Sequence, residues 1–123
     1  MVRIYKIRDS ELVQRKGYEV RYFADITFRE NVSTCGMILV RLEPGSISAP
    51  HGHEHLEEVF VALTKIHVHV DDMTYDLDEG DVIVVGPREM HSFEGLDNNE
   101  ARFIAMKFPN IRDDKFDQET TIS

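Results

Sequence analysis

Short segments in which apolar and polar residues alternate recur along this chain, and turn signals separate them. Residues 18–29 alternate in this way, with Phe23 as the exception, and predict a half-buried strand. Further strands are predicted at residues 37–42, 59–63, 66–70, 74–77, 82–85, 91–93 and 101–108. Strands of this length, with turns about every 8 to 12 residues, are typical of an antiparallel sandwich or a small barrel.

One stretch near the N-terminus has a helical pattern instead. Asp9 or Ser10 could cap a helix over residues 9–15, which would have Leu12 and Val13 on its apolar side. We therefore expect the helical part of this protein there.

The chain is short enough for a single hydrophobic core. Its 123 residues fit one domain, so we expect a single domain over residues 1–123. Residues 18–109 hold the predicted strands and are expected to form its core. Residues 113–123 contain few apolar side chains and are expected to be a weakly ordered tail.

The run His-Gly-His-Glu-His-Leu-Glu-Glu at residues 51–58 gathers imidazoles and carboxylates between a Pro-Gly turn and an apolar strand. In an extended chain, residues two apart point to the same side, so His51 and His53 can direct both rings at one point. His91, beyond a later strand, is a further candidate. Imidazole and carboxylate are the usual ligands of first-row divalent metals. These residues therefore predict a site for one ion with room for water or substrate.

The other candidate side chains have simpler interpretations. His55 is expected at the rim of the site, although it could also serve as a substitute ligand or a proton carrier. His67 and His69 alternate with aliphatic residues and are expected to face solvent. Three aromatic residues are expected in the core but could also line the cavity: Phe60, Phe93 and Phe103.

Composition and charge narrow the class of protein. A hydrophobic content of 41% with 30% charged residues is ordinary for a globular protein. No apolar run approaches the roughly 20 residues of a membrane span, and the N-terminus lacks the apolar core of a signal peptide, so we expect a cytoplasmic protein. The net charge of -9 argues against a nucleic-acid partner. The lone Cys35 allows no internal disulfide and is expected to be a small buried residue.

Two motifs in the sequence resemble those of the cupins, a family of small β-barrel proteins. The first runs from Gly45 through the His-Gly-His triplet to a glutamate at position 57 or 58. The second runs from Gly80 and Asp81 through an aliphatic strand and a Gly-Pro turn to His91. The glycine that usually closes the first motif is absent, and Lys65 or Thr64 stands in its place. This departure leaves the candidate metal ligands untouched.

The resemblance implies an all-β, single-domain double-stranded β-helix, which is a jelly-roll barrel. It also implies that His51, His53, His91 and one glutamate hold one divalent transition metal: Fe, Mn, Ni, Co or Zn. Both Glu57 and Glu58 fit the family spacing. We favour Glu58, because the aliphatic strand at 59–63 then follows without a gap. Glu57 would then point outward as a solvated carboxylate.

Two classes of function are implied by the same resemblance. The first is a metal-dependent enzyme, either an oxygenase or an isomerase or lyase, that acts on a small sugar-like or carboxylated molecule. The alternative is a non-catalytic cupin that binds or senses a small ligand. Small cupins commonly pair, so we expect a homodimer in which the strand at residues 3–7 could be exchanged between copies. Neither a membrane nor a nucleic-acid partner is expected.

Overall fold

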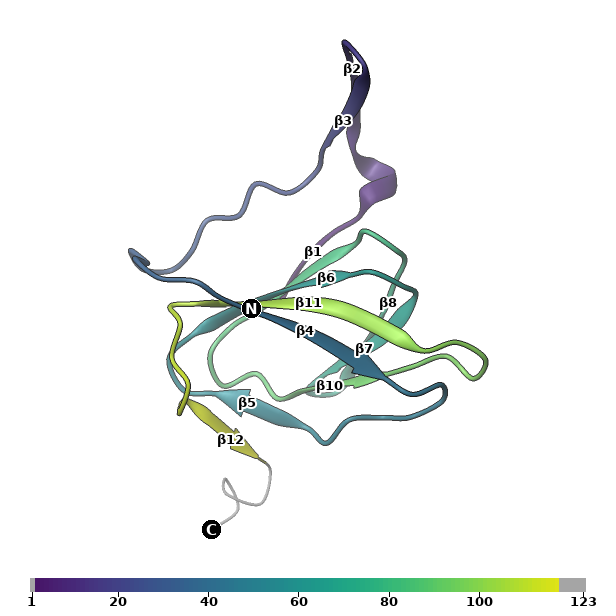
Figure 1. Cartoon of the computed structure of the whole chain (residues 1–123). Coiled ribbons are helices and arrows are strands. Elements are labelled where there is room, and N and C mark those ends of the chain that lie inside the picture. The colour runs from purple at the N-terminus through teal and green to yellow at the C-terminus, as the bar shows by residue number, and fades with distance from the viewer. Residues whose placement is uncertain (1, 118–123) are drawn as a thin grey trace.

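A computed structural model describes residues 2–117 and shows an all-β protein with a single short 3-10 turn, η1 (Ile7–Asp9), in that range (Figure 1). Its first sheet has the order β1-β9-β6-β11-β4, and its second has the order β12-β5-β10-β7-β8. All paired strands are antiparallel, which confirms the predicted barrel class. The strands of the first sheet are β1 (Arg3–Tyr5), β4 (Gly36–Leu42), β6 (Glu57–Ala62), β9 (Val82–Val85) and β11 (Ala101–Phe108). Those of the second are β5 (His51–His53), β7 (Ile66–Val70), β8 (Met73–Leu77), β10 (His91–Glu94) and β12 (Lys115–Asp117).

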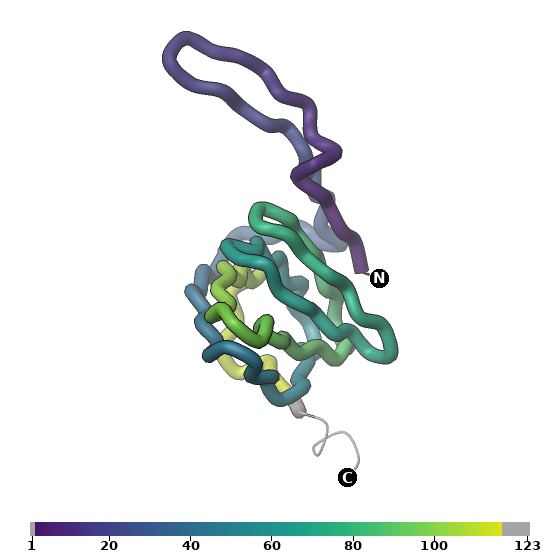
Figure 2. Tube along the Cα trace, turned by 90° about the vertical axis from the view of Figure 1, so that its right-hand side faces the viewer, coloured from purple at the N-terminus to yellow at the C-terminus, as the bar shows by residue number. Residues whose placement is uncertain are grey.

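The core lies inside the barrel that these two sheets form (Figure 2). Alternation along β7 shows how the sequence builds it, because Ile66, Val68 and Val70 are buried between half-buried histidines. His67 and His69 face outward as expected, but each has an acidic partner, since His67 contacts Asp76 and His69 contacts Glu94. Phe60, Phe93 and Phe103 pack against one another in the same core.

A second hydrophobic cluster covers part of the outer face of the first sheet. Val59, Val82 and Val84 are buried there beneath side chains of the segment that joins β3 to β4. Phe23, Ile26 and Phe28 belong to that segment, which crosses the sheet without forming a strand. Residues 23–29 of the predicted strand at 18–29 therefore do not pair, because their apolar side chains cover a sheet face instead.

The N-terminal helix prediction is wrong. Residues 9–15 contain the end of η1 and the strand β2 (Glu11–Arg15), which pairs with β3 (Tyr18–Tyr22) in a hairpin. Gly17, with a φ of 86°, makes the tight turn between them. This hairpin projects from the barrel (Figures 1 and 2), so the expected core does not begin at residue 18. Tyr18 and Tyr22 are 64% and 56% exposed.

β1 pairs with β9 within the chain. Two other expectations differ from the structure. The expected tail begins with the strand β12, which pairs with β5, while residues 118–123 lie outside the described part of the chain. Cys35 is exposed, whereas a buried position was expected.

Residues 2–117 form no helix that is long and apolar enough to cross a membrane.

Asp81 ties the N-terminal segment to the barrel. Its side chain is 1% exposed. The backbone N–H groups of Ile7 and Asp78 donate to its two carboxylate oxygens at 2.9 and 2.8 Å, and Lys6 Nζ donates at 2.9 Å. Burial alone would raise the pKa of Asp81, but these hydrogen bonds and the Lys6 charge outweigh burial and lower it.

Replacing this carboxylate with an amide tests its role. We expect Asp81→Asn to lower the free energy of unfolding by about 1–3 kcal/mol, because an amide cannot accept all three hydrogen bonds and removes the negative charge that pairs with Lys6. Urea denaturation measures the change. The control is Asp78→Asn, whose half-exposed side chain makes only a 3.9 Å ion pair with Lys65 within residues 2–117. Equal destabilisation by the two variants would contradict the proposed anchoring.

Candidate metal centre

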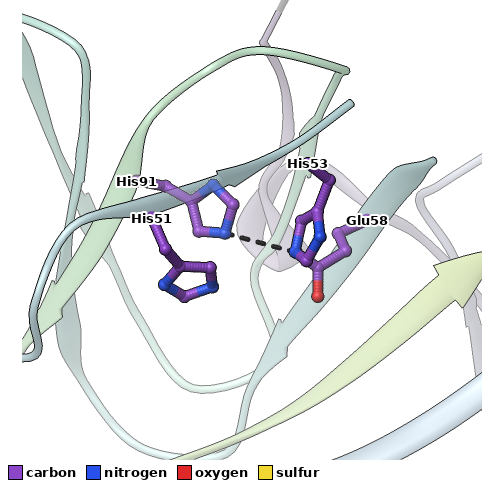
Figure 3. A group of neighbouring side chains, drawn as sticks. All are labelled: His51, His53, Glu58 and His91. Atoms are coloured by element: carbon purple, nitrogen blue, oxygen red, sulfur yellow. Dashed lines mark ion pairs between the residues drawn. The ribbon is translucent and has the colours of Figure 1, made fainter. Parts of the chain in front are cut away.

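Three strands bring together the four residues that the sequence suggested as ligands. His51 and His53 come from β5, Glu58 from β6 and His91 from β10. His51 and His91 are directly opposite on paired strands, so their side chains lie on the same face of the sheet. Figure 3 shows the four side chains directed toward one another. We call this group the His–Glu cluster.

The cluster is compact and largely buried. One candidate ligand atom from each residue lies within 4.8 Å of all the others. Glu58 Oε1 is 2.8 Å from His53 Nε2 and 3.2 Å from His91 Nε2. His53, Glu58 and His91 are 4%, 4% and 2% exposed, whereas His51 is half-buried at the open side. Such a group can enclose an ion and keep one side accessible.

The cluster also contains buried polar atoms that lack hydrogen-bond partners. Among the described residues, both ring nitrogens of His53, Nε2 of His91 and Oε1 of Glu58 have none. His91 Nδ1 is 3.0 Å from the carbonyl oxygen of Glu89, which can only accept. In the neutral imidazole the proton is therefore on Nδ1, and Nε2 turns a lone pair toward the Glu58 carboxylate. A cation between Nε2 of His53, Nε2 of His91 and Oε1 of Glu58 would satisfy these three atoms, so the residues fit a divalent metal.

The cluster shifts the pKa values of two of its members. Burial, and then the charges of His91 and Lys115, lower the pKa of the His51 imidazole from 6.5 to about 4. Burial alone would raise the pKa of Glu58, but the His53 and His91 imidazoles outweigh it and lower that pKa to about 2. Near neutral pH the site therefore offers a neutral His51 and an ionised Glu58, which are the protonation states that a metal requires.

The choice between the two glutamates follows from the strand. Consecutive residues of β6 point to opposite faces, and only Glu58 enters the cluster. Glu57 is buried on the other face, where its carboxylate accepts from the backbone N–H of Arg29 at 2.8 Å and from the Arg3 guanidinium at 3.1 Å. The expectation that Glu57 is solvated is wrong, because the N-terminal segments cover it. His55 is exposed and lies outside the cluster.

Asp114 holds the loop that joins the ligand strands, and the sequence pattern did not reveal it. This buried carboxylate accepts hydrogen bonds from the backbone N–H groups of His55 and Leu56, at 2.8 and 3.0 Å. The loop lies between His53 and Glu58, so Asp114 positions two ligand residues at once. No local signal marks Asp114, because its role arises when the C-terminal segment pairs with β5.

A cavity of about 220 Å³ opens beside the cluster. His51, His53 and Glu58 form one part of its wall, and the three core phenylalanines form another. Lys107 and Lys115 also line the cavity, and the sequence pattern did not predict this position for either of them. A larger surface hollow of about 540 Å³ among Thr64, Asp78 and Glu100 contains no cluster residue. A further hollow of about 470 Å³ is lined by His91 but by no other member of the cluster, whereas the cavity of about 220 Å³ is lined by three of the four. The cavity of about 220 Å³ therefore offers a ligand the widest access to the candidate metal centre.

Comparisons with known proteins agree with this architecture. A family model described as "Cupin domain" matches residues 38–107, which is more than half of the chain. A search among curated proteins gives no match. A cupin protein from Bacteroides fragilis is 18% identical with a TM-score of 0.59, and the match covers 63% of this chain and 68% of that one.

Two solved enzyme structures are also similar. A dTDP sugar isomerase from Desulfovibrio desulfuricans is 11% identical with a TM-score of 0.67, covering 94% of this chain and 82% of that one. An oxalate decarboxylase from Lactobacillus farciminis, solved as a formate complex, is 19% identical with a TM-score of 0.63, covering 72% of this chain and 28% of that one. At these identities the likeness shows a shared fold, and it confirms the expected double-stranded β-helix.

The environment of His51 leads to a prediction for the metal-free protein. NMR titration should show the His51 imidazole gaining its proton near pH 4 instead of near pH 6.5. Because the unfolded chain takes up this proton at the higher pH, His51 should lower the stability of the folded state as the pH falls from about 6.5 to about 4. The imidazole resonance that is absent from the spectrum of His51→Ala identifies the signal of His51. A pKa near 6.5 for this resonance would contradict the statement that burial lowers the pKa of His51.

Proposed function

The chain belongs to the cupin family, and from that premise we propose that it is a metal-dependent enzyme that acts on a small molecule at the His–Glu cluster. The observation that carries the proposal is the convergence of buried ligand atoms without hydrogen-bond partners beside a cavity. His51, His53, Glu58 and His91 would hold one divalent transition metal: Fe, Mn, Ni, Co or Zn. Nitrogen and oxygen donors suit these ions without choosing among them.

The proposed reaction class is an oxygenase or an isomerase or lyase. A bound divalent metal would supply Lewis-acid chemistry that polarises an oxygen atom of the substrate. His51, the half-buried ligand, lies where the cluster meets the cavity. The phenylalanine walls would exclude water and orient the substrate beside the cluster. A sugar isomerase and an oxalate decarboxylase among proteins of similar fold support an enzyme on a small molecule.

Binding without turnover is the second candidate function. One observation favours it, which is the small number of groups that could transfer protons in the cavity. Apart from the cluster, the polar side chains that line it are those of Ser48, Lys107 and Lys115. Turnover of any compound in a broad substrate panel would favour the enzyme, whereas tight binding without turnover would favour a sensor.

We also infer that two copies form a homodimer. The hairpin of β2 and β3 forms a sheet of its own, and an isolated hairpin is marginally stable in water. Met37 and Leu39 on β4 are 68% and 63% exposed on the outer face of the edge strand. Packing between these surfaces in a two-fold arrangement would cover both. A single domain over residues 1–123 and a cytoplasmic location remain predictions.

Metal content tests the proposed centre. Elemental analysis of protein purified without added metal should find about one transition-metal ion per chain. His51→Ala and His91→Ala should each lose most of it, because each removes a nitrogen ligand. The matched control is His69→Ala, which removes a histidine that faces away from the core and should leave metal content unchanged. Circular dichroism checks that all variants are folded. Equal metal content in the parent and the three variants would contradict the proposed metal centre.

Light scattering tests the dimer. The parent should have a mass near twice 14.2 kDa, and Leu39→Asp should shift it toward one chain, because a buried unpaired charge opposes association. Met73→Asp is the control, since Met73 is 58% exposed on β8, the edge strand of the other sheet. A parent mass of one chain, or loss of the dimer in both variants alike, would contradict the proposed surface.

A further inference from the structure

We propose that the cavity beside the His–Glu cluster binds a small carboxylate with an apolar body, and that Lys107 and Lys115 recognise the carboxylate group. This inference rests on the function proposed above, because it names the substrate class of the same cavity. It depends on three observations, which are the register of the strands, the charges around the cavity and the apolar character of its walls.

Strand register places both lysines on the face that holds the ligands. Lys107 on β11 is directly opposite Glu58 on β6. Lys115 on β12 is directly opposite His53 on β5. Directly opposite residues of antiparallel strands present their side chains on the same face. The two lysines therefore line the cavity from strands of different sheets, each opposite a residue of the cluster.

The charges around this cavity are opposite in sign to those of the whole chain. The protein has a net charge of -9, yet the only carboxylate that lines the cavity within the described residues is Glu58. Neither Lys107 nor Lys115 has an ion pair or a side-chain hydrogen bond with any residue in the range 2–117. Lys115 is close enough to His51 that its charge contributes to the lowered pKa of that imidazole. With a divalent ion at Glu58, the cavity would have a positive excess that favours an anion.

The other side chains that line the cavity favour an anion whose uncharged part is apolar. Ile38, Val40 and Ala105 join the three phenylalanines around the cavity, and Ser48 is the one uncharged polar side chain outside the cluster that lines it among the described residues. A sugar would bury several hydroxyl groups here without hydrogen-bond partners, which is costly. A volume of about 220 Å³ is below the ~300–1,000 Å³ of cavities for drug-sized ligands. A ligand about the size of benzoate suits both the volume and the aromatic walls.

Calorimetric titration with benzoate and with benzamide tests the inference, because the two probes share a shape and differ in charge. We expect benzoate to bind and benzamide to bind at least about tenfold more weakly. Lys107→Gln and Lys115→Gln should each weaken benzoate binding about fivefold, as the loss of an exposed charge pair predicts, and should leave benzamide binding unchanged. Lys65→Gln is the matched control, because Lys65 is exposed and lies outside this cavity.

Each titration is made with chelator-treated protein and with zinc-loaded protein, and the metal content of every variant is measured. Lysine-dependent binding of benzoate by protein that takes up no metal would overturn the proposed function and leave this inference standing. Normal metal content with equal affinities for benzoate and benzamide would overturn the inference alone. It would also be overturned if the two cavity variants behaved like Lys65→Gln, or if benzoate bound to neither form.

Discussion

The structure of this protein depends on one costly arrangement, which is a carboxylate and three imidazoles that converge in an otherwise apolar barrel. Oε1 of Glu58 lies 3.2 Å from His91 Nε2, and the hydrogen bond from His91 Nδ1 to a carbonyl oxygen directs a lone pair at that carboxylate. Two electron-rich atoms at this distance repel each other unless a cation or an extra proton lies between them. Burial strengthens the effect, because the interior screens charge less than water does. The site therefore favours binding of a positive ion over an empty, neutral state.

Much of the surrounding structure holds these atoms in place. Asp114 accepts from two backbone N–H groups between His53 and Glu58, and it reaches them because β12 pairs with β5. Gly52, between the two ligand histidines, is close to Phe116 and Met90, which a side chain at this position would meet at 3.0 and 3.2 Å. The C-terminal segment thus contacts β5 and the loop after it, which carry or adjoin the residues of the cluster. A segment that looks like a tail in the sequence is part of the machinery that positions the ligands.

The distribution of charge separates the cavity from the outer surface. The chain has more acidic than basic residues. Glu57, which adjoins Glu58 of the cluster, points away from the cavity and pairs with Arg3. Inside, Lys107 and Lys115 lie beside the ligands. With a divalent ion at Glu58, such a cavity would favour a small anion. The same fold could serve a different ligand if these two positions changed, because they are not metal ligands.

The sequence by itself determined the barrel class and pointed to the residues of the His–Glu cluster, whereas the tertiary structure decided what surrounds that cluster. Alternation and turn signals predicted the strands that form the barrel, because this pattern repeats within a few residues of one strand. The two-residue spacing of His51 and His53 is local in the same way, whereas Glu58 and His91 were joined to them by the resemblance to the cupin motifs. The strand β2, the covering segment at 23–28 and the strand β12 were missed. The covering segment and β12 depend on partners far along the chain, and so do the positions of the two lysines, whereas β2 pairs with the adjacent strand β3. Pairing register between distant strands leaves no local pattern, so only the folded chain decides it.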